Sequence, residues 1–310
     1  MPDTAAHGVV AVVVTFQPEV AVTSVLLRAL APQVEHVVVV DNGSPAGTVD
    51  ALRAELAPVD GELLTLGANL GIGEAQNRGI ARARELGARA VLLSDQDSVP
   101  AADMVERLVA GLARARAEHG PVAAVGPVTV DERNAGAALL FSDHRWGPRR
   151  ALLPDEDGAL APATFLIASG CLVDVAALDV VGPMNAAWFI DHVDLEWGLR
   201  ARRAGYGLYG VVGARLGHAL GDRVQRIPGR ERDVHIHSPV RNYYMARNTV
   251  LLVRSGLLPV AWRVGYLAWI TKYTGFYVLA VAPRGRRARL LLRGLLDGAR
   301  GRTGRLQEDR

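Results

Sequence analysis

The sequence predicts an α/β fold in which a mostly parallel sheet carries helices on both faces, followed by a helical extension at the C-terminus. Short β-branched runs alternate with segments of helical periodicity through the first half of the chain. Each run ends in polar or glycine residues, as strands buried on both faces do. A chain of 310 residues, 50% of them hydrophobic, is also long enough for one large domain with a well-buried core.

The alternation can be followed element by element. Residues 9–16 and 34–44 are predicted strands, and apolar positions at helical spacing indicate a helix over 19–33 between them. A strand and loop over 61–71, a helix over 72–87 that ends at a glycine, and a further strand over 88–95 repeat this order. Such a succession implies right-handed crossovers and a parallel sheet.

Composition excludes several classes of protein. A single cysteine, Cys171, rules out an intramolecular disulfide and a cysteine-rich metal site, and a role for it as a nucleophile has no local signature. The N-terminus has neither the basic region nor the cleavage site of a signal peptide, so we expect a cytoplasmic protein. The pI of about 9.3 is weak evidence for nucleic-acid binding.

Polar side chains stand where the predicted parallel strands end. Thr15 and Asp41 follow the first two strands, and the stretch SDQDS brings Asp95 and Asp97 to the end of a later one. Ligands of such sheets bind outside these strand ends. Carboxylates crowded there need a compensating ligand, and Mg²⁺ or Mn²⁺ suits oxygen ligands and a diphosphate. The alternative is an ordinary loop in which Asp95 caps a helix starting near Ala101 and Asp97 faces solvent.

A second acidic cluster lies within residues 185–211. The spacing of Asp194 and Glu196 suits a helix whose first turn holds the carboxylates, near the positive end of the helix dipole. A helix cap at Asp191 or Asp194 with a solvated acidic turn is locally an adequate alternative.

These motifs together resemble the nucleotide-sugar-binding half of family 2 glycosyltransferases, which have the GT-A fold, a Rossmann-like α/β architecture. The resemblance rests on VTF, VDNGS, NLGIGEAQNRG and LLSDQDS in this order, and it extends from residue 9 to about 218. Asn77 is equally well explained as an ordinary residue of a helix surface. The residues that the resemblance assigns to the nucleotide-sugar are Thr15, Phe16, Asp41, Asn69, Gly71, Asn77 and Asp95.

The resemblance further implies a divalent metal, Mn²⁺ or Mg²⁺, that bridges the diphosphate. Asp97 matches the metal ligand of the family, and Asp95 would lie near the metal and the ribose. His218 stands at the distance beyond the acidic cluster where the family has a metal-binding histidine. A lone histidine is otherwise more often structural.

A general base is also implied. Aligning VDLEWGLRARRAGY on the acidic motif of the family puts Asp194 in the base position and Val193 where the family usually has its first acid. Asp191, from the preceding loop, is the alternative base. A positioned carboxylate accelerates attack by a hydroxyl by about 10²–10⁴-fold. One base opposite the leaving group implies a single displacement with inversion.

Two further residues are assigned to the acceptor pocket together with Asp191. Gly170, in FLIASGCLVD, matches a turn ahead of that pocket, where it would allow close approach. Trp188 either stacks on a sugar face or fills the core.

The donor sugar follows from a closer resemblance. LSDQDS, ASGCLVD and FIDHVDLEWGLRA look most like bacterial rhamnosyltransferases that use dTDP-L-rhamnose to build cell-surface polysaccharides. UDP-sugars such as galactofuranose, glucose or galactose are the alternative donors, and the acceptor is a saccharide or a lipid-linked saccharide.

Beyond residue 218 the resemblance weakens. A helix is predicted to begin near Arg241, and Arg247 on it either clamps a phosphate of the donor or forms a surface salt bridge. The following apolar segment carries five aromatic residues, but Arg263 and Lys272 make it a poor transmembrane span. With the arginine-rich stretch after it, we expect an interfacial helix at the anionic inner leaflet of the membrane. A core helix or a homodimer contact is the alternative.

The predicted domains are a glycosyltransferase domain over 1–235, divided near residue 128 into nucleotide-sugar and acceptor halves, and C-terminal helices over 236–310. A nucleic-acid-associated or regulatory nucleotide-binding protein is the rival from another class. It requires a basic face with exposed aromatic residues, whereas here carboxylates gather where phosphates would bind. A nucleotidyltransferase would carry an early glycine-rich phosphate loop, which the sequence lacks.

Overall fold

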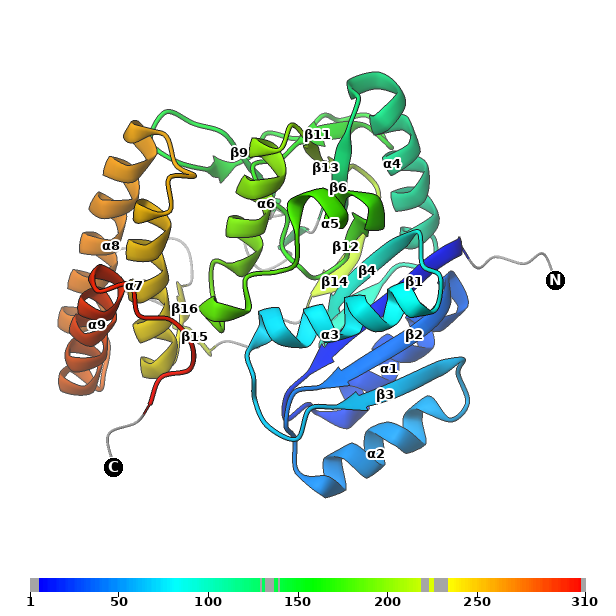
Figure 1. Ribbon diagram of the computed structural model, residues 1–310, viewed down its shortest axis with the longest axis horizontal. Helices are drawn as coiled ribbons and strands as arrows, with labels where there is room; N and C mark the ends of the chain where they lie inside the picture. Colours follow the sequence, from blue (N-terminus) through cyan, green and yellow to red (C-terminus); the bar gives the residue numbers. More distant parts are fainter. Residues whose placement is uncertain are drawn as a thin grey trace.

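An eight-stranded sheet forms the centre of the computed structural model, which describes residues 6–128, 130–131, 137–138, 140–218, 223–225 and 234–307. The strands lie in the order β11-β13-β6-β12-β4-β1-β2-β3 (Figure 1). Their bounds are β1 Ala6–Thr15, β2 Val34–Asp41, β3 Gly61–Thr65, β4 Ala90–Asp95, β6 Val122–Pro127, β11 Leu160–Pro162, β12 Cys171–Asp174 and β13 Gly207–Val211. A separate two-stranded sheet joins β5 (Ser98–Pro100) to β14 (Leu216–His218).

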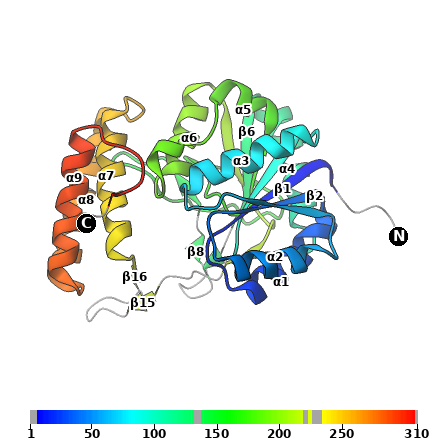
Figure 2. The ribbon, with the colours of Figure 1, turned by 60° about the horizontal axis from the view of Figure 1, so that its bottom comes forward.

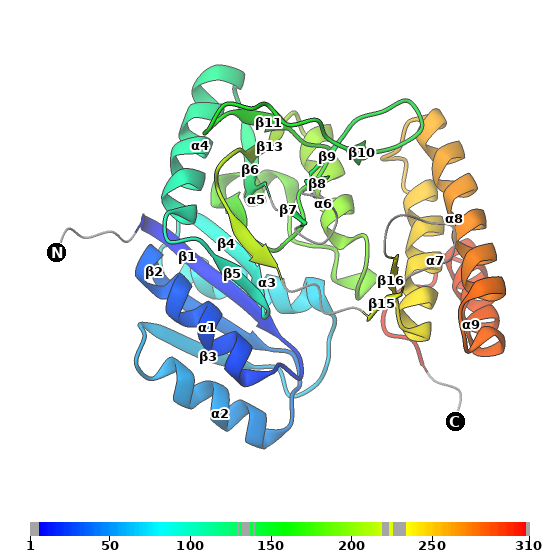
Figure 3. The same cartoon turned by 180° about the vertical axis from the view of Figure 1, so that it is seen from behind.

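Helices cover both faces of this sheet. Figure 2 shows α3, α5 and α6 on one side and α1 and α2 on the other, and Figure 3 shows the second side from the front. The helix bounds are α1 Val20–Leu30, α2 Ala46–Leu56, α3 Ile72–Glu85, α4 Met104–His119, α5 Val175–Val181, α6 Val193–Arg203, α7 Pro239–Arg254, α8 Val260–Ala280 and α9 Arg284–Ala299. Short 3-10 turns occupy Ala31–Gln33 and Ala186–Trp188.

The β-branched composition of the central strands follows from burial on two faces. Alternate residues of β1 belong to different cores, because successive side chains of a strand point to opposite sides. Val10, Val12 and Val14 pack with residues of α3, α5 and α6. Val9 and Val13 pack with residues of α1 and α4 on the other face. The predicted mostly parallel sheet with helices on both faces is confirmed: β1 runs parallel to β2 and β4, and β2 runs parallel to β3.

Two antiparallel strands interrupt this pattern. β12 runs antiparallel to both β4 and β6, and β11 runs antiparallel to β13. β12 is only four residues long and enters the sheet between strands that precede it in the chain. Its lone cysteine, Cys171, is buried, and burial raises the pKa of the thiol well above its usual range, which disfavours the reactive thiolate.

Helices α7, α8 and α9 form a layer beside the sheet (Figures 1 and 2). A Cβ atom at Gly298 would lie 2.6 Å from the Arg247 carbonyl oxygen, and one at Gly294 would overlap the Tyr243 carbonyl oxygen. The two glycines, one turn apart on α9, therefore let α9 approach the α7 backbone closely. In the part of the chain that the structure describes, no helix is both long enough and apolar enough to cross a membrane.

The contact between α3 and the sheet provides a test of the packing. A Cβ atom at Gly79 would overlap Val12 and lie 3.1 Å from Val40, so we expect Gly79→Ala to lower the free energy of unfolding by about 1–3 kcal/mol. Gly275→Ala on α8 is the matched control, since a Cβ atom there meets no neighbour within 4 Å. The control should be neutral or stabilised by up to about 1 kcal/mol. Urea denaturation measures both changes, and equal stabilities of the two variants would contradict this packing.

Candidate active site

The ends of β1 and β2 meet in register at Thr15 and Asp41. Both residues are almost completely buried, and Thr15 Oγ1 donates a hydrogen bond of 3.3 Å to Asp41 Oδ1. Asp41 Oδ2 accepts from the backbone N–H groups of Gly43 (3.1 Å) and Ser44 (2.9 Å). Asp41 therefore shapes the turn after β2. Because a carboxylate has about four acceptor positions, it retains capacity for a ligand.

The predicted nucleotide wall is linked to this turn through Asn42, which sequence reasoning missed. Asn42 donates to Asn69 Oδ1 (3.2 Å) and accepts from the N–H of Leu70 (2.8 Å). Gly71 has a φ of 92°, and a Cβ atom there would lie 2.6 Å from the Phe189 carbonyl oxygen. This loop is thus held both to the turn after β2 and to the segment that precedes α6.

The two aspartates of the SDQDS stretch are half-buried at the end of β4. Between them, Gln96 accepts from the Phe16 N–H through its side chain (2.8 Å) and from Thr23 Oγ1 through its backbone (3.2 Å). Ser98 is paired in backbone register with His218 across β5 and β14. The structure therefore brings the His218 backbone next to the Asp97 segment, whereas the His218 side chain lies outside what it describes. The helix after this turn begins at Met104, so Asp95 does not cap a helix starting near Ala101.

Asp194 lies in the first turn of α6, where its Oδ2 accepts a 3.1 Å hydrogen bond from the Ala168 N–H. Burial, together with the negative charge of Asp95, raises the pKa of Asp194 to about 7, and the Ala168 hydrogen bond opposes this shift. Asp191 adds a smaller repulsive contribution. The second acidic cluster is therefore electrostatically coupled to the carboxylates at the end of β4.

The loop before α6 has an unusual backbone. Phe189, Asp191 and His192 all have positive φ values, of 67°, 65° and 62°. Such conformations cost about 1–3 kcal/mol each for residues other than glycine and persist where neighbouring structure enforces them. Fully buried Asn248 on α7 supplies this enforcement, because its Nδ2 lies within 3.0 Å of three carbonyl oxygens of the loop, those of Trp188, Ile190 and Asp191.

Asp191 is oriented by an ion pair. Its Oδ1 accepts from Arg241 Nε at 2.9 Å, and its side chain is only 3% exposed. Its Oδ2 is buried and makes no hydrogen bond with any residue that the structure describes. A buried carboxylate oxygen without a partner is costly, so this atom is suited to accept a hydrogen bond from a bound ligand.

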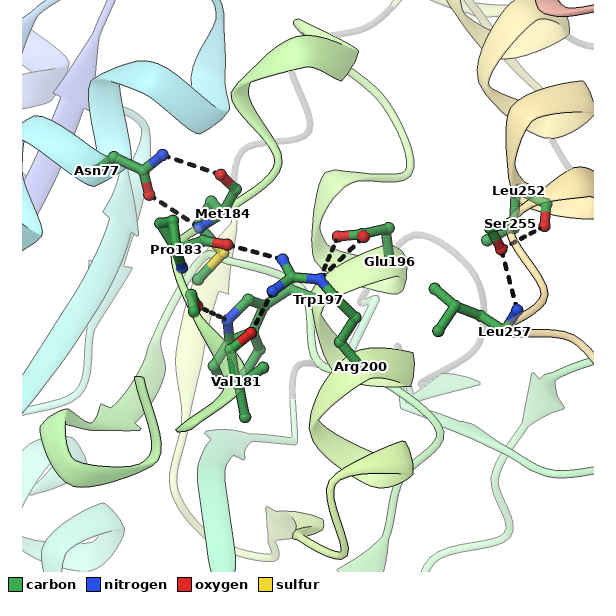
Figure 4. Close-up of polar contacts among 11 residues, drawn as sticks. Asn77, Val181, Pro183, Met184, Glu196, Trp197, Arg200, Leu252, Ser255 and Leu257 are labelled. Carbon is green, nitrogen blue, oxygen red and sulfur yellow. Dashed lines mark hydrogen bonds and ion pairs between the residues drawn. The ribbon is translucent and has the colours of Figure 1, made fainter. Parts of the chain in front are cut away.

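Helix α6 is anchored to the end of α5 and to the residues that follow it, as Figure 4 shows. Arg200 Nε donates to both carboxylate oxygens of Glu196 (2.9 and 3.0 Å), and the terminal nitrogens of Arg200 donate to the carbonyls of Val181 (2.6 Å) and Pro183 (2.7 Å). Trp197 Nε1 donates to the neighbouring Gly182 carbonyl at 3.0 Å. Glu196 therefore fixes the helix rather than adding a third carboxylate to the site.

Asn77 has a role in this framework that differs from its predicted one. Its side chain donates to the Met184 carbonyl (2.9 Å) and accepts from the Met184 N–H (2.8 Å), as Figure 4 shows. These two bonds join α3 to the loop that Arg200 grips. The geometry thus explains Asn77 as a clamp between the two halves of the fold and gives no support to direct contact with the nucleotide.

The structure differs from the prediction for Arg247 and decides between the two roles predicted for Trp188. Arg247 is 1% exposed, and its guanidinium donates to the carbonyls of Trp188 (2.8 Å) and Gly304 and to Asn248 Oδ1 (2.9 Å). A guanidinium with its donors used in this way is not available to clamp a phosphate. Trp188 is buried in the main core, so of its two predicted roles the structure favours core filling over stacking on a sugar.

Gly170 packs closely against other residues of the protein, whereas it was predicted to allow close approach of the acceptor. It has a φ of 81°, and a Cβ atom there would lie 2.6 Å from the Pro127 side chain and 3.0 Å from Leu216. The absence of a side chain is explained by this packing, and the structure gives no support to an acceptor contact at Gly170.

A cavity of about 370 Å³ opens beside Asp194, and it was not predicted. Helix α8 forms one wall, and a loop around Trp146 and the first turn of α6 form the others. The lining residues are Phe141, Trp146, Gly147, Pro148, Phe165, His192, Asp194, Leu195, Gly265, Tyr266 and Trp269.

Comparison with known proteins agrees with this geometry. The model of the family described as glycosyl transferase family 2 matches residues 11–169. The chain is 31% identical over 298 residues to the dTDP-rhamnosyl transferase RfbF of Shigella flexneri, which covers 96% of this chain and 97% of that protein.

Solved structures show the same fold at low sequence identity. The mannosyltransferase PcManGT of Pyrobaculum calidifontis, in complex with GDP-Man and Mn²⁺, superimposes with a TM-score of 0.54 at 18% identity, covering 97% of this chain and 77% of that one. S. aureus TarS 1–349, in complex with UDP-GlcNAc, gives a TM-score of 0.57 at 15% identity, covering 94% and 80%. These similarities confirm the expected GT-A architecture.

The electrostatics of Asp194 predict an effect on stability. Its pKa in the folded protein, about 7, exceeds the ordinary value of 3.8, so the folded state binds this proton more tightly than the unfolded chain does. The free energy of unfolding therefore falls as pH rises between these values, and the penalty is complete above about pH 7. We expect Asp194→Asn, without divalent cations, to be more stable than the wild type at pH 8 by on the order of 2 kcal/mol.

Thermal or urea denaturation at pH 8 and pH 4.5 checks this prediction, since most of the gain should vanish at the lower pH. Asp50→Asn on α2 is the control, because that carboxylate is exposed and should show no such gain. If Asp194→Asn is no more stable than the wild type at pH 8, the pKa of Asp194 is not raised in the folded protein.

Proposed function

The chain belongs to glycosyl transferase family 2, and from this premise we propose that it transfers L-rhamnose from dTDP-L-rhamnose to a hydroxyl group of a saccharide or lipid-linked saccharide in cell-surface polysaccharide synthesis. The observation that carries the proposal is the position of Asp194, a carboxylate of raised pKa beside the carboxylates that end β4. The 31% identity to a dTDP-rhamnosyl transferase supports the donor. Because the chain is a glycosyltransferase, the rival hypothesis of a non-enzymatic nucleotide- or nucleic-acid-binding protein falls away.

Asp194 is the proposed general base. A base is most effective when its pKa lies near the working pH, and Asp194 meets this condition. Asp191 is the weaker candidate, because its Oδ1 is already engaged by Arg241 Nε at 2.9 Å. We assign Asp191 to binding the acceptor through its unpartnered Oδ2.

The reaction is then a single displacement. Asp194 takes the proton of the acceptor hydroxyl while the hydroxyl oxygen forms a bond to the anomeric carbon of the donor. The bond from that carbon to the diphosphate oxygen breaks on the opposite face, dTDP leaves, and Asp194 returns its proton to solvent. With one base and no second displacement, the anomeric configuration inverts.

The donor would lie along the ends of β1, β2 and β4. Thr15, Phe16 and Asp41 would hold the nucleoside, with the loop of Asn69 and Gly71 as its wall. This placement follows the general rule for ligands of parallel sheets, and the hydrogen bonds of Asp41 and Asn42 organise the backbone there in advance.

The residues at the end of β4 fit a divalent cation. Asp95 and Asp97 place two half-buried carboxylates there, and burial, together with the charge of Asp95, raises the pKa of Asp194. Carboxylate oxygens are ligands that Mn²⁺ and Mg²⁺ accept. We propose that Asp97 and Asp95 hold the ion, with His218 as a further ligand; when bound, the ion would neutralise charge on the diphosphate leaving group. The neighbour solved with GDP-Man and Mn²⁺ supports this choice.

Nucleotide binding tests the donor site. We expect dTDP with Mn²⁺ or Mg²⁺ to raise the melting temperature of the protein by roughly 5 °C at a hundredfold excess over Kd, because the ligand binds only the folded state. Asp97→Ala or EDTA should remove the metal-dependent part of this rise, and Asp50→Ala should keep it. A preference for UDP would replace the donor within the same enzyme class. An absence of any shift with dTDP, UDP or GDP would contradict the proposed site.

The C-terminal helices bear on where the enzyme works. We expected the aromatic residues of α8 to lie at the membrane interface, but Trp262 and Tyr277 are buried in the protein. The turn between α8 and α9 is accessible, because Leu279 is 74% exposed and is followed by exposed arginines. We propose that this turn, residues 279–289, rests on the anionic inner leaflet and brings the enzyme to a lipid-linked acceptor.

Vesicle co-sedimentation tests this proposal. The wild type should bind vesicles containing phosphatidylglycerol and release them at high salt, and the double variant Arg286→Glu/Arg289→Glu should bind roughly tenfold more weakly. Arg300→Glu, the same charge reversal at the other end of α9, should bind as the wild type does. Equal binding by all three proteins, or a dimer that the double variant dissociates, would assign this turn to another role.

A further inference from the structure

The cavity beside Asp194 is the strongest feature that the proposed chemistry leaves unused. Its volume, about 370 Å³, lies within the range of small-molecule sites. Two large aromatic side chains line it while remaining accessible, since Trp146 is 47% exposed and Trp269 is 40% exposed. Core packing does not explain aromatic surfaces left open in this way, whereas a bound ligand that covers them does.

The walls of the cavity are held in place by the protein. A Cβ atom at Gly265 on α8 would overlap the Trp146 carbonyl oxygen, so the helix and the tryptophan loop are in direct contact. Trp262 strengthens this contact by donating from Nε1 to the His144 carbonyl at 2.8 Å. On the far side, the rings of Phe141 and Phe165 stack at a centroid distance of 5.1 Å. The cavity is therefore largely formed before any ligand arrives.

The chemistry of the lining is aromatic and, apart from one carboxylate, neutral. Tyr266 and Trp269 each contact the His192 ring, with centroid distances of 6.2 and 6.3 Å. Burial lowers the pKa of His192 to about 4, and its Nε2 is paired with Thr249 Oγ1 at 2.9 Å, so the imidazole is neutral near pH 7. No arginine or lysine lines the cavity among the residues that the structure describes, which argues against an anionic ligand.

We infer that this cavity binds the acceptor as a neutral pyranose ring, stacked against Trp269 and Trp146 with one hydroxyl directed at Asp194. A sugar ring has an apolar C–H face that matches an aromatic wall and hydroxyl groups at its edge that match a carboxylate. A hydrocarbon chain would offer the Asp194 carboxylate no hydrogen bond beyond the one from Ala168. The inference rests on the proposed function, and it assigns acceptor recognition to α8, which lies outside the segment matched by the family model.

The test measures acceptor binding separately from turnover. Octyl glycosides of D-glucose, D-galactose, N-acetyl-D-glucosamine and L-rhamnose serve as probes for the wild type, Trp269→Ala, Trp269→Phe and Leu267→Ala. Leu267 lies on the same helix, is 48% exposed and does not line the cavity. Saturation-transfer NMR without donor reports which protons of each probe touch the protein, and a transfer assay with dTDP-L-rhamnose gives the acceptor KM.

We expect ring protons of at least one probe to receive saturation and its acceptor KM to rise about fivefold or more in Trp269→Ala. Trp269→Phe should restore most of the affinity, and Leu267→Ala should match the wild type. The shift in melting temperature with dTDP should stay unchanged in all variants, because neither Trp269 nor Leu267 belongs to the proposed donor site.

The inference fails if Trp269→Ala binds the probes as the wild type does, if saturation falls on the octyl chain instead of the ring, or if no probe binds at millimolar concentration. A different result would be a protein that binds a probe, loses this binding in Trp269→Ala, and transfers sugar from no tested donor. It would uphold the cavity as a sugar site and contradict the proposed donor chemistry. The two failures are therefore distinguishable.

Discussion

The burial of Asp194 together with its repulsion from the carboxylate of Asp95 is the constraint around which the rest of this structure is organised. These residues come from β4 and from α6, about a hundred positions apart in the chain, and burial and the charge of Asp95 raise the pKa of Asp194. Bringing them together disfavours the folded state unless a cation or a ligand shares their charge. The same burial and repulsion give Asp194 a pKa of about 7, which suits the general base proposed for the reaction. The raised pKa of Asp194 thus lowers the free energy of unfolding at neutral pH and at the same time suits the proposed base.

Several buried polar contacts hold this arrangement. The Asn77 side chain joins α3 to Met184, Arg200 grips the adjacent carbonyls, and Asn248 binds three carbonyls of the loop before α6. Each contact satisfies backbone groups that would otherwise be buried without a partner. The Asn248 contacts hold the loop in which three residues have positive φ, and all three sets of contacts fix the segment that carries Asp191 and Asp194. The C-terminal helices therefore take part in building the site, as well as in covering the sheet.

The sequence allowed the strands and their polar ends to be predicted, because both signals are local. β-branched runs followed by Thr15, Asp41 and Asp95 mark parallel strands without knowledge of their neighbours. The contacts of Asn77 and Arg247 could not be predicted, since their partners lie 57 to 107 residues away. The insertion of the short antiparallel strand β12 into the sheet depends on pairing at similar distance. The aromatic cavity was missed for the same reason. Helical periodicity shows that α8 is apolar, but it does not show which of its aromatic side chains line a cavity together with Asp194.

The pH dependence of kcat/KM for the donor tests the central claim most directly, because this ratio reports ionisation in the free enzyme. Initial rates of transfer from dTDP-L-rhamnose would be measured from pH 5 to pH 9 at a fixed concentration of Mn²⁺. Burial raises the pKa of this base, and Mn²⁺ beside Asp95 offsets the contribution of that charge, so the account predicts a rate that climbs with pH through a midpoint between about 5 and 7 and is lost in Asp194→Asn. A rate that is already maximal at pH 5, or one that survives in Asp194→Asn, would contradict the assignment of Asp194 as the base.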